Sequence, residues 1–398
     1  MTEDLSLKTE MAIVGAGIVG LAAAISLHLA GYSVVLIDEK LPTFSSDLDS
    51  EHWDNRVYAI SPKNAEWLKE LGVWQFMNPT RIGEMQAMVI SDHVSTLMLN
   101  ADDANIDRLG FVIESNVLMQ VLMQKVEELA ISCKFDCTCT SLKTSNEGTK
   151  ITLSHGEKVE ASLLLAADGS RSWVRRALNM SVQQKQYKQT AIVANFEIEK
   201  AHTNIARQWF SHDNESKNSI LAYLPLPGNR ISIVWSVSVE YAEKLLALSE
   251  EAFTKQVKLA GDSTLGQMRL ITQPVSFPLA LQKTNTLMQD CVLLMGDAAH
   301  QIHPLAGQGM NLGFRDVIDF LNIIKSRHAM QTINDQSILR KYVRARKADT
   351  LKMILLTDGL FQLFENNNNV VKKIRELGLT ATAYQPIKKI LLENAIML

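Results

Sequence analysis

The chain has 398 residues, of which 46% are hydrophobic, enough for two or three domains with buried cores. Its 40 lysines and arginines nearly balance its 43 acidic residues, and the net charge of −3 argues against nucleic acid as a partner. No apolar run approaches the roughly 18 residues of a membrane span, and the acidic first ten residues are unlike a secretory leader. We therefore expect a cytoplasmic protein.

The first forty residues predict a strand, a helix and a second strand. A short apolar run at 11–14 leads into Gly15-Ala16-Gly17-Ile18-Val19-Gly20, and an Ala- and Leu-rich helix follows to Ala30. The second strand, at 33–37, ends in Asp38-Glu39. A G-x-G-x-x-G sequence between a strand and a helix is typical of dinucleotide-binding sites.

Each glycine of this motif has its own physical role. Gly15 permits the tight turn, Gly17 lets the backbone approach a pyrophosphate, and Gly20 lets the helix pack closely on the strand. Asp38, eighteen residues after Gly20, can accept hydrogen bonds from a ribose diol. Because its carboxylate repels a 2′-phosphate, NADP is a poor fit at this site.

The middle of the chain predicts helices and then many strands. Helices are expected at 63–71 and from a cap at Ser115 or Asn116 to Leu129, with strands at 81–101 between them. Residues 131–167 predict a meander, and 188–280 are rich in strands around one helix near 249–259. A strand is expected at 132–142, with Cys133, Cys137 and Cys139 at positions of the same parity, but their spacing lacks a zinc-binding pattern, so we expect thiols and no metal site.

The most specific stretch is 296–316. An apolar run at 292–295 leads into Gly296-Asp297, a loop rich in Gly, Ala and Pro follows, and a helix is expected from about Asn311. A strand, an acid, a tight loop and a helix N-terminus together form a phosphate and ribose site. Asp168-Gly169, after the apolar run at 163–167, repeats the pattern of an acid at a strand end. These separated elements predict one long dinucleotide held at both ends.

The order of these three elements resembles that of the class A flavoprotein aromatic hydroxylases, the para-hydroxybenzoate hydroxylase group. The run from His300 to Gly313 is similar to the ubiquinone-biosynthesis hydroxylases, as are Arg56, Phe277-Pro278-Leu279 and Arg315-Asp316. The resemblance spans nearly the whole chain and implies an α/β fold. It implies a discontinuous Rossmann-like FAD-binding domain (1–80, 105–185 and 285–325), an antiparallel-sheet substrate domain (81–104 and 186–284) and a helical C-terminal region (326–398).

The resemblance also implies which residues contact FAD. Gly15, Ala16, Gly17 and Gly20 would hold the pyrophosphate, Asp38 and Glu39 the adenosine ribose, and Gly296 with Asp297 the ribityl chain. Arg56 would neutralise phosphate charge. Asp168 and Gly169 would order the region around the ribityl chain and the passing pyridine nucleotide. The remaining implied contacts lie near the flavin ring: Pro304, Gly307, Gly309, Met310 and Asn311.

The implied reaction is hydroxylation of a polyprenylated phenol in ubiquinone biosynthesis. NADPH or NADH would transiently reduce FAD, and O2 would then give a flavin C4a-hydroperoxide that the electron-rich ring attacks. The protein would orient the ring and exclude water, so no acid–base dyad is required. We interpret His300 as a hydrogen-bonded loop residue, whereas His303 remains open between a chemical and a structural role.

The strand-rich middle region offers aromatic and apolar candidates for contact with the substrate. They are Trp209, Phe210, Tyr223, Leu224, Pro225 and Trp235. Each of these residues would equally suit the core of a sheet, and the sequence leaves the two interpretations open.

The C-terminal region differs in charge from the rest. From Lys325 to Leu398 there are 13 basic and 6 acidic residues, a net +7, so the remainder is −10. Lys341, Arg344, Arg346 and Lys347 precede an apolar run at 353–356. One interpretation is a solvated helix, and the other is docking to the inner membrane surface or to a ubiquinone-biosynthesis complex.

Two other functions stay open at this point. One is a related FAD enzyme that acts on another aromatic or isoprenoid substrate, as an epoxidase, halogenase or reductase. The other is a flavoprotein without catalytic activity that binds partners as a scaffold. The mass of the product would distinguish the first alternative from the hydroxylase. NADPH consumption that a phenol stimulates would distinguish the hydroxylase from a non-catalytic scaffold.

Overall fold

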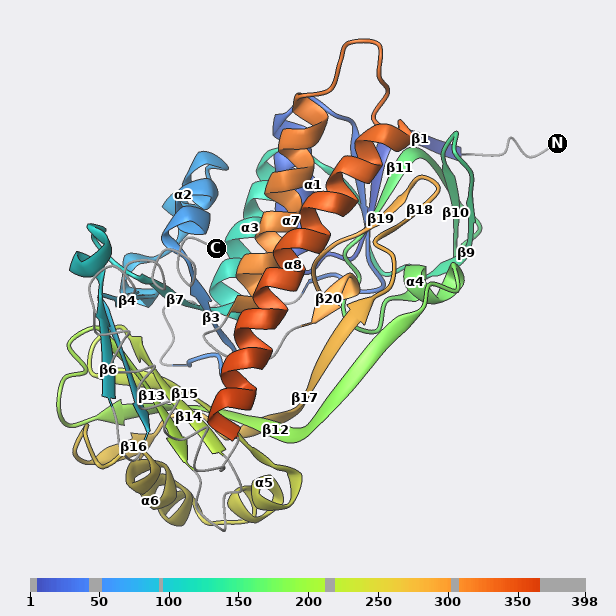
Figure 1. The fold of residues 1–398 in the computed structure, drawn as a ribbon. Coiled ribbons are helices and arrows are strands. Elements are labelled where there is room, and N and C mark those ends of the chain that lie inside the picture. Colours follow the sequence, from blue (N-terminus) through green and yellow to red (C-terminus); the bar gives the residue numbers. More distant parts are fainter. Residues whose placement is uncertain (1–5, 43–51, 93–95, 212–218, 302–307, 366–398) are drawn as a thin grey trace.

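The computed structural model describes residues 6–42, 52–92, 96–211, 219–301 and 308–365 (Figure 1). The predicted mixed α/β fold is confirmed, with one sheet whose strand β1 leads into the glycine motif, a second large sheet and a small third one. Within these ranges no helix is both long and apolar enough to cross a bilayer.

The first sheet is centred on β1 (Ser6–Val14), which pairs in parallel with β2 (Val34–Ile37) and β11 (Lys158–Ala166). Its strand order is β18-β19-β11-β1-β2-β8, with β10 and β9 attached beyond β11. The other strands are β8 (Ser132–Lys134), β9 (Cys139–Thr144), β10 (Thr149–Leu153), β18 (Met288–Gln289) and β19 (Val292–Leu294). The predicted strand, helix and strand at 11–37 are confirmed.

Both faces of this sheet are buried. Met11 and Ile13 face a core shared with helices, whereas Ala12 and Val14 face a second core against β9, β10 and α4. The helices on the first face include α1 (Ile18–Leu29), α3 (Ser115–Glu128), α7 (Gln308–Lys325) and α8 (Gln336–Glu365) (Figure 1). A parallel strand covered on both sides is a continuous apolar run, which is what residues 11–14 show.

The second sheet is mostly antiparallel and has the order β20-β17-β12-β15-β14-β13-β5-β6, with β16 on β12. Its strands are β5 (Ala87–Asp92), β6 (Thr96–Asn100), β12 (Val182–Ile198), β13 (Ile205–Ser211), β14 (Ser219–Leu226), β15 (Arg230–Ser238), β16 (Met268–Leu270), β17 (Val275–Thr284) and β20 (His300–Gln301). Helices α5 (Val239–Leu246) and α6 (Glu250–Ala260) cover one of its faces. The long strands β12 and β17 run between this sheet and the first one (Figure 1).

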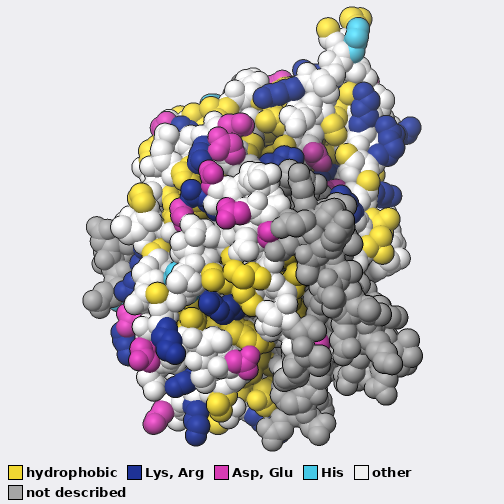
Figure 2. Space-filling view, turned by 60° about the vertical axis from the view of Figure 1, so that its left-hand side comes forward, with side chains coloured by type: hydrophobic (Ala, Val, Ile, Leu, Met, Phe, Trp, Pro, Cys, Tyr) yellow, Lys and Arg dark blue, Asp and Glu magenta, His cyan; other side chains and the backbone are white. Residues whose placement is uncertain are grey.

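The third sheet joins β3 (Val57–Ile60), β7 (Gly110–Glu114) and β4 (Ile82–Met85). The remaining helices are α2 (Pro62–Glu70), α4 (Trp173–Ala177) and the short 3-10 helices η1 (Trp74–Phe76), η2 (Pro79–Arg81), η3 (Ala101–Ala104) and η4 (Gly296–Ala298). On the face shown in Figure 2, hydrophobic side chains gather near the centre, and basic and acidic side chains are interspersed around them.

Two local predictions were wrong. Helix α3 begins at Ser115 with Glu114 as its N-cap residue, and no side chain caps it, so neither Ser115 nor Asn116 is the cap. The three neighbouring cysteines do not share one strand, because Cys133 lies in β8, Cys139 in β9 and Cys137 in the connection between them. By contrast, Ser249 caps α6 by accepting a hydrogen bond from the Ala252 amide.

Candidate cofactor and substrate site

The glycine motif forms the turn between β1 and α1. Gly15 has a φ of +109°, and a Cβ there would overlap the carbonyl oxygen of Ala167. A Cβ on Gly20 would overlap the Gly15 carbonyl oxygen, whereas a Cβ on Gly17 would meet no atom within 4 Å. Gly15 and Gly20 are therefore required by the fold, while Gly17 leaves space for a ligand beside the start of α1.

Asp38, at the end of β2, closes this turn. Its Oδ2 accepts a hydrogen bond of 2.5 Å from the Ala16 amide, and Oδ1 accepts one of 3.0 Å from the Lys40 amide. The next residue, Glu39, is exposed. Asp38 thus lies beside the glycine motif, as a carboxylate that binds the ribose of a nucleotide should.

The second element is the turn after β19. Gly296 has a φ of +56°, and its amide donates a 2.7 Å hydrogen bond to Oδ2 of Asp316 on α7. The same oxygen lies 2.8 Å from Nε2 of His300. His300 is buried and hydrogen-bonded, as expected, but it lies in the short strand β20 and not in a loop. Asp316 therefore fixes the turn that presents Asp297.

Asp297 faces the cavity described below. Its side chain is accessible from that cavity, but the surrounding protein displaces most of the water, and this desolvation raises the pKa of its carboxyl. Electrostatic interaction with His300 and with Arg56 lowers the pKa of Asp297 and so offsets part of this increase. A carboxylate in such a position gains free energy when ligand hydroxyls replace the missing water.

The third element follows β11. Oδ2 of Asp168 accepts a 3.0 Å hydrogen bond from the Val174 amide, and burial raises the pKa of this carboxyl. Oδ1 of Asp168 is buried and has no hydrogen-bond partner among the described residues. Gly169, with a φ of +78°, lines the cavity, and a Cβ there would meet no atom within 4 Å.

The start of α7 is fixed by a buried amide. Oδ1 of Asn311 accepts hydrogen bonds from the Ser61 amide (2.9 Å) and from Nδ2 of Asn64 (2.8 Å). Its Nδ2 donates to the Ala59 carbonyl at 2.8 Å. The side chain of Asn311 thus joins α7 to β3 and α2. This leaves the backbone of Gly309 and Met310 at the cavity.

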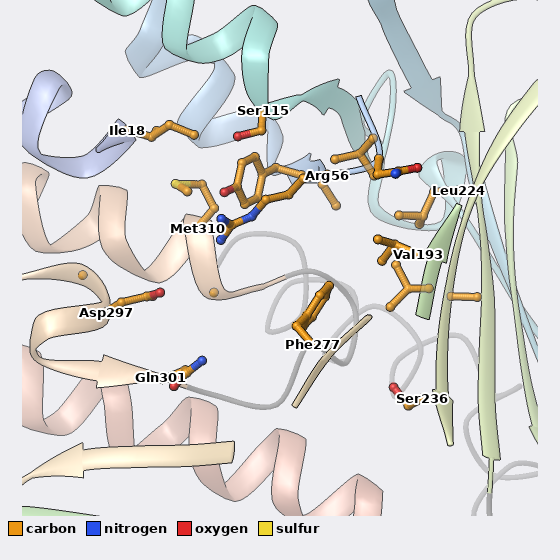
Figure 3. Close-up of a pocket in the computed structure, with 18 of the residues that line it drawn as sticks. Ile18, Arg56, Ser115, Val193, Leu224, Ser236, Phe277, Asp297, Gln301 and Met310 are labelled. Atoms are coloured by element: carbon orange, nitrogen blue, oxygen red, sulfur yellow. The ribbon is translucent and has the colours of Figure 1, made fainter. Parts of the chain in front are cut away.

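One cavity of about 560 Å³ connects these elements to the second sheet (Figure 3). Its volume lies within the range of small-molecule sites. The nucleotide side includes seven of the predicted cofactor contacts: Gly17, Arg56, Gly169, Gly296, Asp297, Gly309 and Met310. Arg56 also lies near Tyr58, with its guanidinium carbon 5.3 Å from the ring centroid, and burial raises the pKa of that tyrosine.

The opposite wall is made by strands of the second sheet. Strand residues with the same parity face the cavity, and all but two of them, Gln208 and Ser236, are apolar: Met88, Val193, Ala206, Gln208, Ile220, Ala222, Leu224, Val234 and Ser236. Phe277 of β17 lies between this wall and the nucleotide side (Figure 3). A flat aromatic ring with an apolar tail suits such a wall.

The predicted substrate contacts lie on the right strands but mostly on the wrong face. Trp209, Tyr223 and Trp235 are buried in the core against α5 and α6, and the Tyr223 hydroxyl donates a 2.7 Å hydrogen bond to the Val257 carbonyl. Pro225 and Phe210 do not line the cavity either, whereas Leu224 does. Because both faces of the sheet are covered, aromatic residues did not mark the cavity side. Ile220 and Ala222 alternate with Leu224 along β14 and so share its face. Val234, which pairs with Ala222, and Val193, which pairs with Val234, could have been identified in the same way.

His303, Pro304 and Gly307 lie outside the described residues, so their predicted roles remain predictions. Among the four basic residues singled out on α8, Arg346 is buried and the other three are exposed. Its Nε lies 2.5 Å from Oδ1 of Asp316, and its Nη1 lies 2.7 Å from carboxylate oxygens of Asp319 and Asp349. The assignment of Arg346 to a surface cluster was therefore wrong.

The donor set fits an adenine dinucleotide such as FAD. Three glycines that line the cavity would each leave a side chain's space empty: Gly17, Gly169 and Gly309. Oδ1 of Asp168 is buried and has no partner within the described ranges, and the N-terminus of α1 lies at the cavity. Backbone amides at a helix start favour phosphate, and carboxylates favour ribose or ribityl hydroxyls.

Comparison with known proteins agrees with this geometry. The family model described as "FAD binding domain" matches residues 8–354, and the chain belongs to this family. It is 32% identical over 394 residues to a ubiquinone hydroxylase (UbiL) of Rhodospirillum rubrum, covering 97% of this chain and 89% of the relative. It is 30% identical over 377 residues to the 3-demethoxyubiquinol 3-hydroxylase of Escherichia coli, covering 94% of each chain.

The fold is also found among solved structures. The crystal structure of PqsL from P. aeruginosa in complex with 2-aminobenzoylacetate superimposes with a TM-score of 0.76. That match has 18% sequence identity and covers 94% of this chain and all of the other. At this level of identity the match establishes the shared fold alone.

Proposed function

We propose that the protein is an FAD-dependent monooxygenase that hydroxylates the aromatic ring of a polyprenylated phenol in ubiquinone biosynthesis. The observation that supports this most directly is the single cavity that joins three nucleotide-binding turns to an apolar wall. The similarity to a ubiquinone hydroxylase over almost the whole chain supports the substrate class.

Different residues around the cavity would bind different parts of FAD. Gly17 and the start of α1 would receive the pyrophosphate, Asp38 the adenosine ribose, and Asp297 the ribityl hydroxyls. Arg56 would balance negative charge on the cofactor. The chemistry supplied by bound FAD is the activation of O2 with electrons from NADPH or NADH.

The chain itself would position the ring and exclude water. Val193, Ala222 and Val234 present a wall without charge, against which an aromatic ring can lie facing Met310 and Asp297. An apolar wall keeps water from the reacting oxygen, which favours transfer to the substrate over release of H2O2.

The test uses FAD-loaded protein with 2-(3-methylbut-2-enyl)phenol as a short-chain substrate. We expect this phenol to stimulate oxidation of NADPH or NADH and to give a product that is heavier by one oxygen atom, labelled when 18O2 is supplied. Stimulated oxidation with only H2O2 as product would contradict hydroxylation of this ring. A product without added oxygen would instead indicate another reaction of the family.

We also propose that α8 carries a docking surface for an anionic membrane. This surface would hold the cytoplasmic enzyme at the inner membrane. Lys341, Arg344 and Lys347 are exposed, as are Leu351 (47%) and Leu355 (66%) on the same helix. Basic residues beside exposed leucines match the headgroup region of such a surface. A lipid-tailed substrate would then be available where the enzyme binds.

A further inference from the structure

One polar side chain stands in the middle of the apolar wall. Gln208 of β13 pairs with Ala222 of β14, which pairs with Val234 of β15, so the three residues share the cavity face. The neighbouring Trp209 points to the opposite core. Gln208 therefore directs its amide toward the substrate side of the cavity.

The amide of Gln208 has no hydrogen-bond partner among the residues that the structure describes. The residue is only 8% exposed, and within the described ranges its side chain forms no hydrogen bond. A side-chain amide offers two donor hydrogens and a carbonyl acceptor, and here these groups reach the cavity, where a ligand that displaces water must pair with them. An unpaired polar group in a binding cavity is best explained by a ligand that pairs with it.

The surroundings of Gln208 indicate a neutral ligand group. Ser236 is the other polar residue of this parity among the described residues that line the wall. Arg207 also borders the cavity, but its guanidinium donates to the carbonyls of His202 and Ile205. Among the described residues this wall contributes no acidic group, and Nη1 of its one cation, Arg207, is held by backbone carbonyls, so a neutral ligand group is favoured beside Gln208.

We infer that Gln208 determines substrate specificity by hydrogen bonding to the phenolic hydroxyl of the ring, an inference that rests on the proposed function. A phenol both donates and accepts a hydrogen bond, which matches the carbonyl and the NH2 group of one amide. The hydroxyl then fixes the orientation of the ring against the wall formed by Ala222 and Val234. Sites built this way reject analogues that lack the hydroxyl.

The test compares two compounds that differ in one hydroxyl. Dissociation constants of 2-(3-methylbut-2-enyl)phenol and of (3-methylbut-2-enyl)benzene are measured on FAD-loaded protein from the change in flavin absorbance. Wild type should bind the phenol about tenfold more tightly. Gln208→Met should reduce this preference to about twofold or less, mainly by weakening phenol binding, and Gln208→Leu should do the same.

Two control measurements separate specificity from folding. Leu224→Met changes the same wall without changing its polarity, so the preference for the phenol should persist. The thermal midpoint of the FAD-free Gln208→Met variant should stay close to that of wild type, because the substitution removes no hydrogen bond between this amide and the described residues.

Two results would overturn the inference while the proposed function stands. They are an unchanged preference in both Gln208 variants, or no preference in a wild-type enzyme that hydroxylates the phenol. If wild type hydroxylates no phenol, the proposed function fails and the inference fails with it. A lowered thermal midpoint in both variants, together with loss of FAD, would assign Gln208 to the fold and overturn its role in specificity.

Discussion

Arg346 of α8 and Asp316 of α7 form a buried ion pair with 2.5 Å between Nε and Oδ1. The other oxygen of Asp316 accepts from the Gly296 amide and lies beside His300. Burial alone would raise the pKa of Asp316, but His300 and Arg346 together lower it. A helix near the C-terminal end of the described chain thus supports the turn that presents Asp297.

The first prediction concerns this pair. Arg346→Met should lower the free energy of unfolding by about 3–5 kcal/mol, because it leaves buried carboxylates without their partner. Urea unfolding of the FAD-free protein measures the effect. Arg344→Met, at an exposed position on the same helix, should stay within about 0.5 kcal/mol of wild type. Equal losses in the two variants would show that the buried pair is not the cause.

The second prediction uses the raised pKa of Asp297. The folded protein holds a proton there more readily than the unfolded chain, so this stabilising contribution is present at low pH. It is lost as pH rises from the unfolded pKa through the higher folded pKa. FAD-free Asp297→Asn should therefore be more stable than wild type at pH 7, and this difference should shrink toward pH 3.

Thermal or urea unfolding across this pH range provides the measurement. Asp107→Asn, at an exposed carboxylate, serves as the control and should show no such trend. A pH-independent difference between wild type and Asp297→Asn would contradict the explanation.

In the same series, Asp297→Ala should weaken FAD binding about tenfold or more, because ribityl hydroxyls lose a partner.

The third prediction contrasts two glycines of one motif. Gly17→Val should leave the FAD-free protein folded, because a Cβ there meets no atom within 4 Å, but it should abolish FAD binding by filling the pyrophosphate space. Gly20→Ala should instead damage the fold itself, since its Cβ would overlap the Gly15 carbonyl. Circular dichroism and flavin absorbance of the two purified variants distinguish the outcomes. Normal flavin content in Gly17→Val would remove this glycine from the site.

The fourth prediction tests the outer face of α8. Reversing Lys341, Arg344 and Lys347 to Glu should strongly reduce co-sedimentation with anionic liposomes, at about 1 kcal/mol for each basic residue lost. Binding by wild type should weaken with salt, and FAD content should be unchanged. The matched control reverses three exposed lysines elsewhere: Lys63, Lys244 and Lys255. Equal binding by both triple variants would refute a specific surface on α8.

Local motifs made the nucleotide elements predictable. The turn at 15–20 depends on contacts between residues that are close in sequence or in adjacent strands, so a short pattern specifies it. The same holds for Gly296-Asp297, where the strand, the turn and the helix follow one another. The fold class follows from these elements, because a glycine turn between a buried strand and a helix occurs in few architectures.

The substrate side was less predictable because it depends on which face of a sheet is covered by helices. Tyr223 and Leu224 are neighbours on β14, and one lies in the core while the other lines the cavity. Nothing within the strand distinguishes its two buried faces. The burial of Arg346 was unpredictable for a similar reason. Its partners on α7 lie about thirty residues away in the sequence, and the sequence of α8 alone does not indicate them.

The β12–β17 ribbon has a mechanical consequence for the cavity. At one end Val193 and Phe277 border the substrate space, and at the other β17 pairs with β20 beside the Asp297 turn. On either side of one register shift the paired strands resist shear, and this favours a fixed spacing between the cofactor side and the substrate side of the cavity. Bending of the ribbon is easiest at the one register shift between Gln186 and Thr190. If a bulky, tailed substrate requires a wider cavity, we therefore expect the ribbon to bend at this interruption.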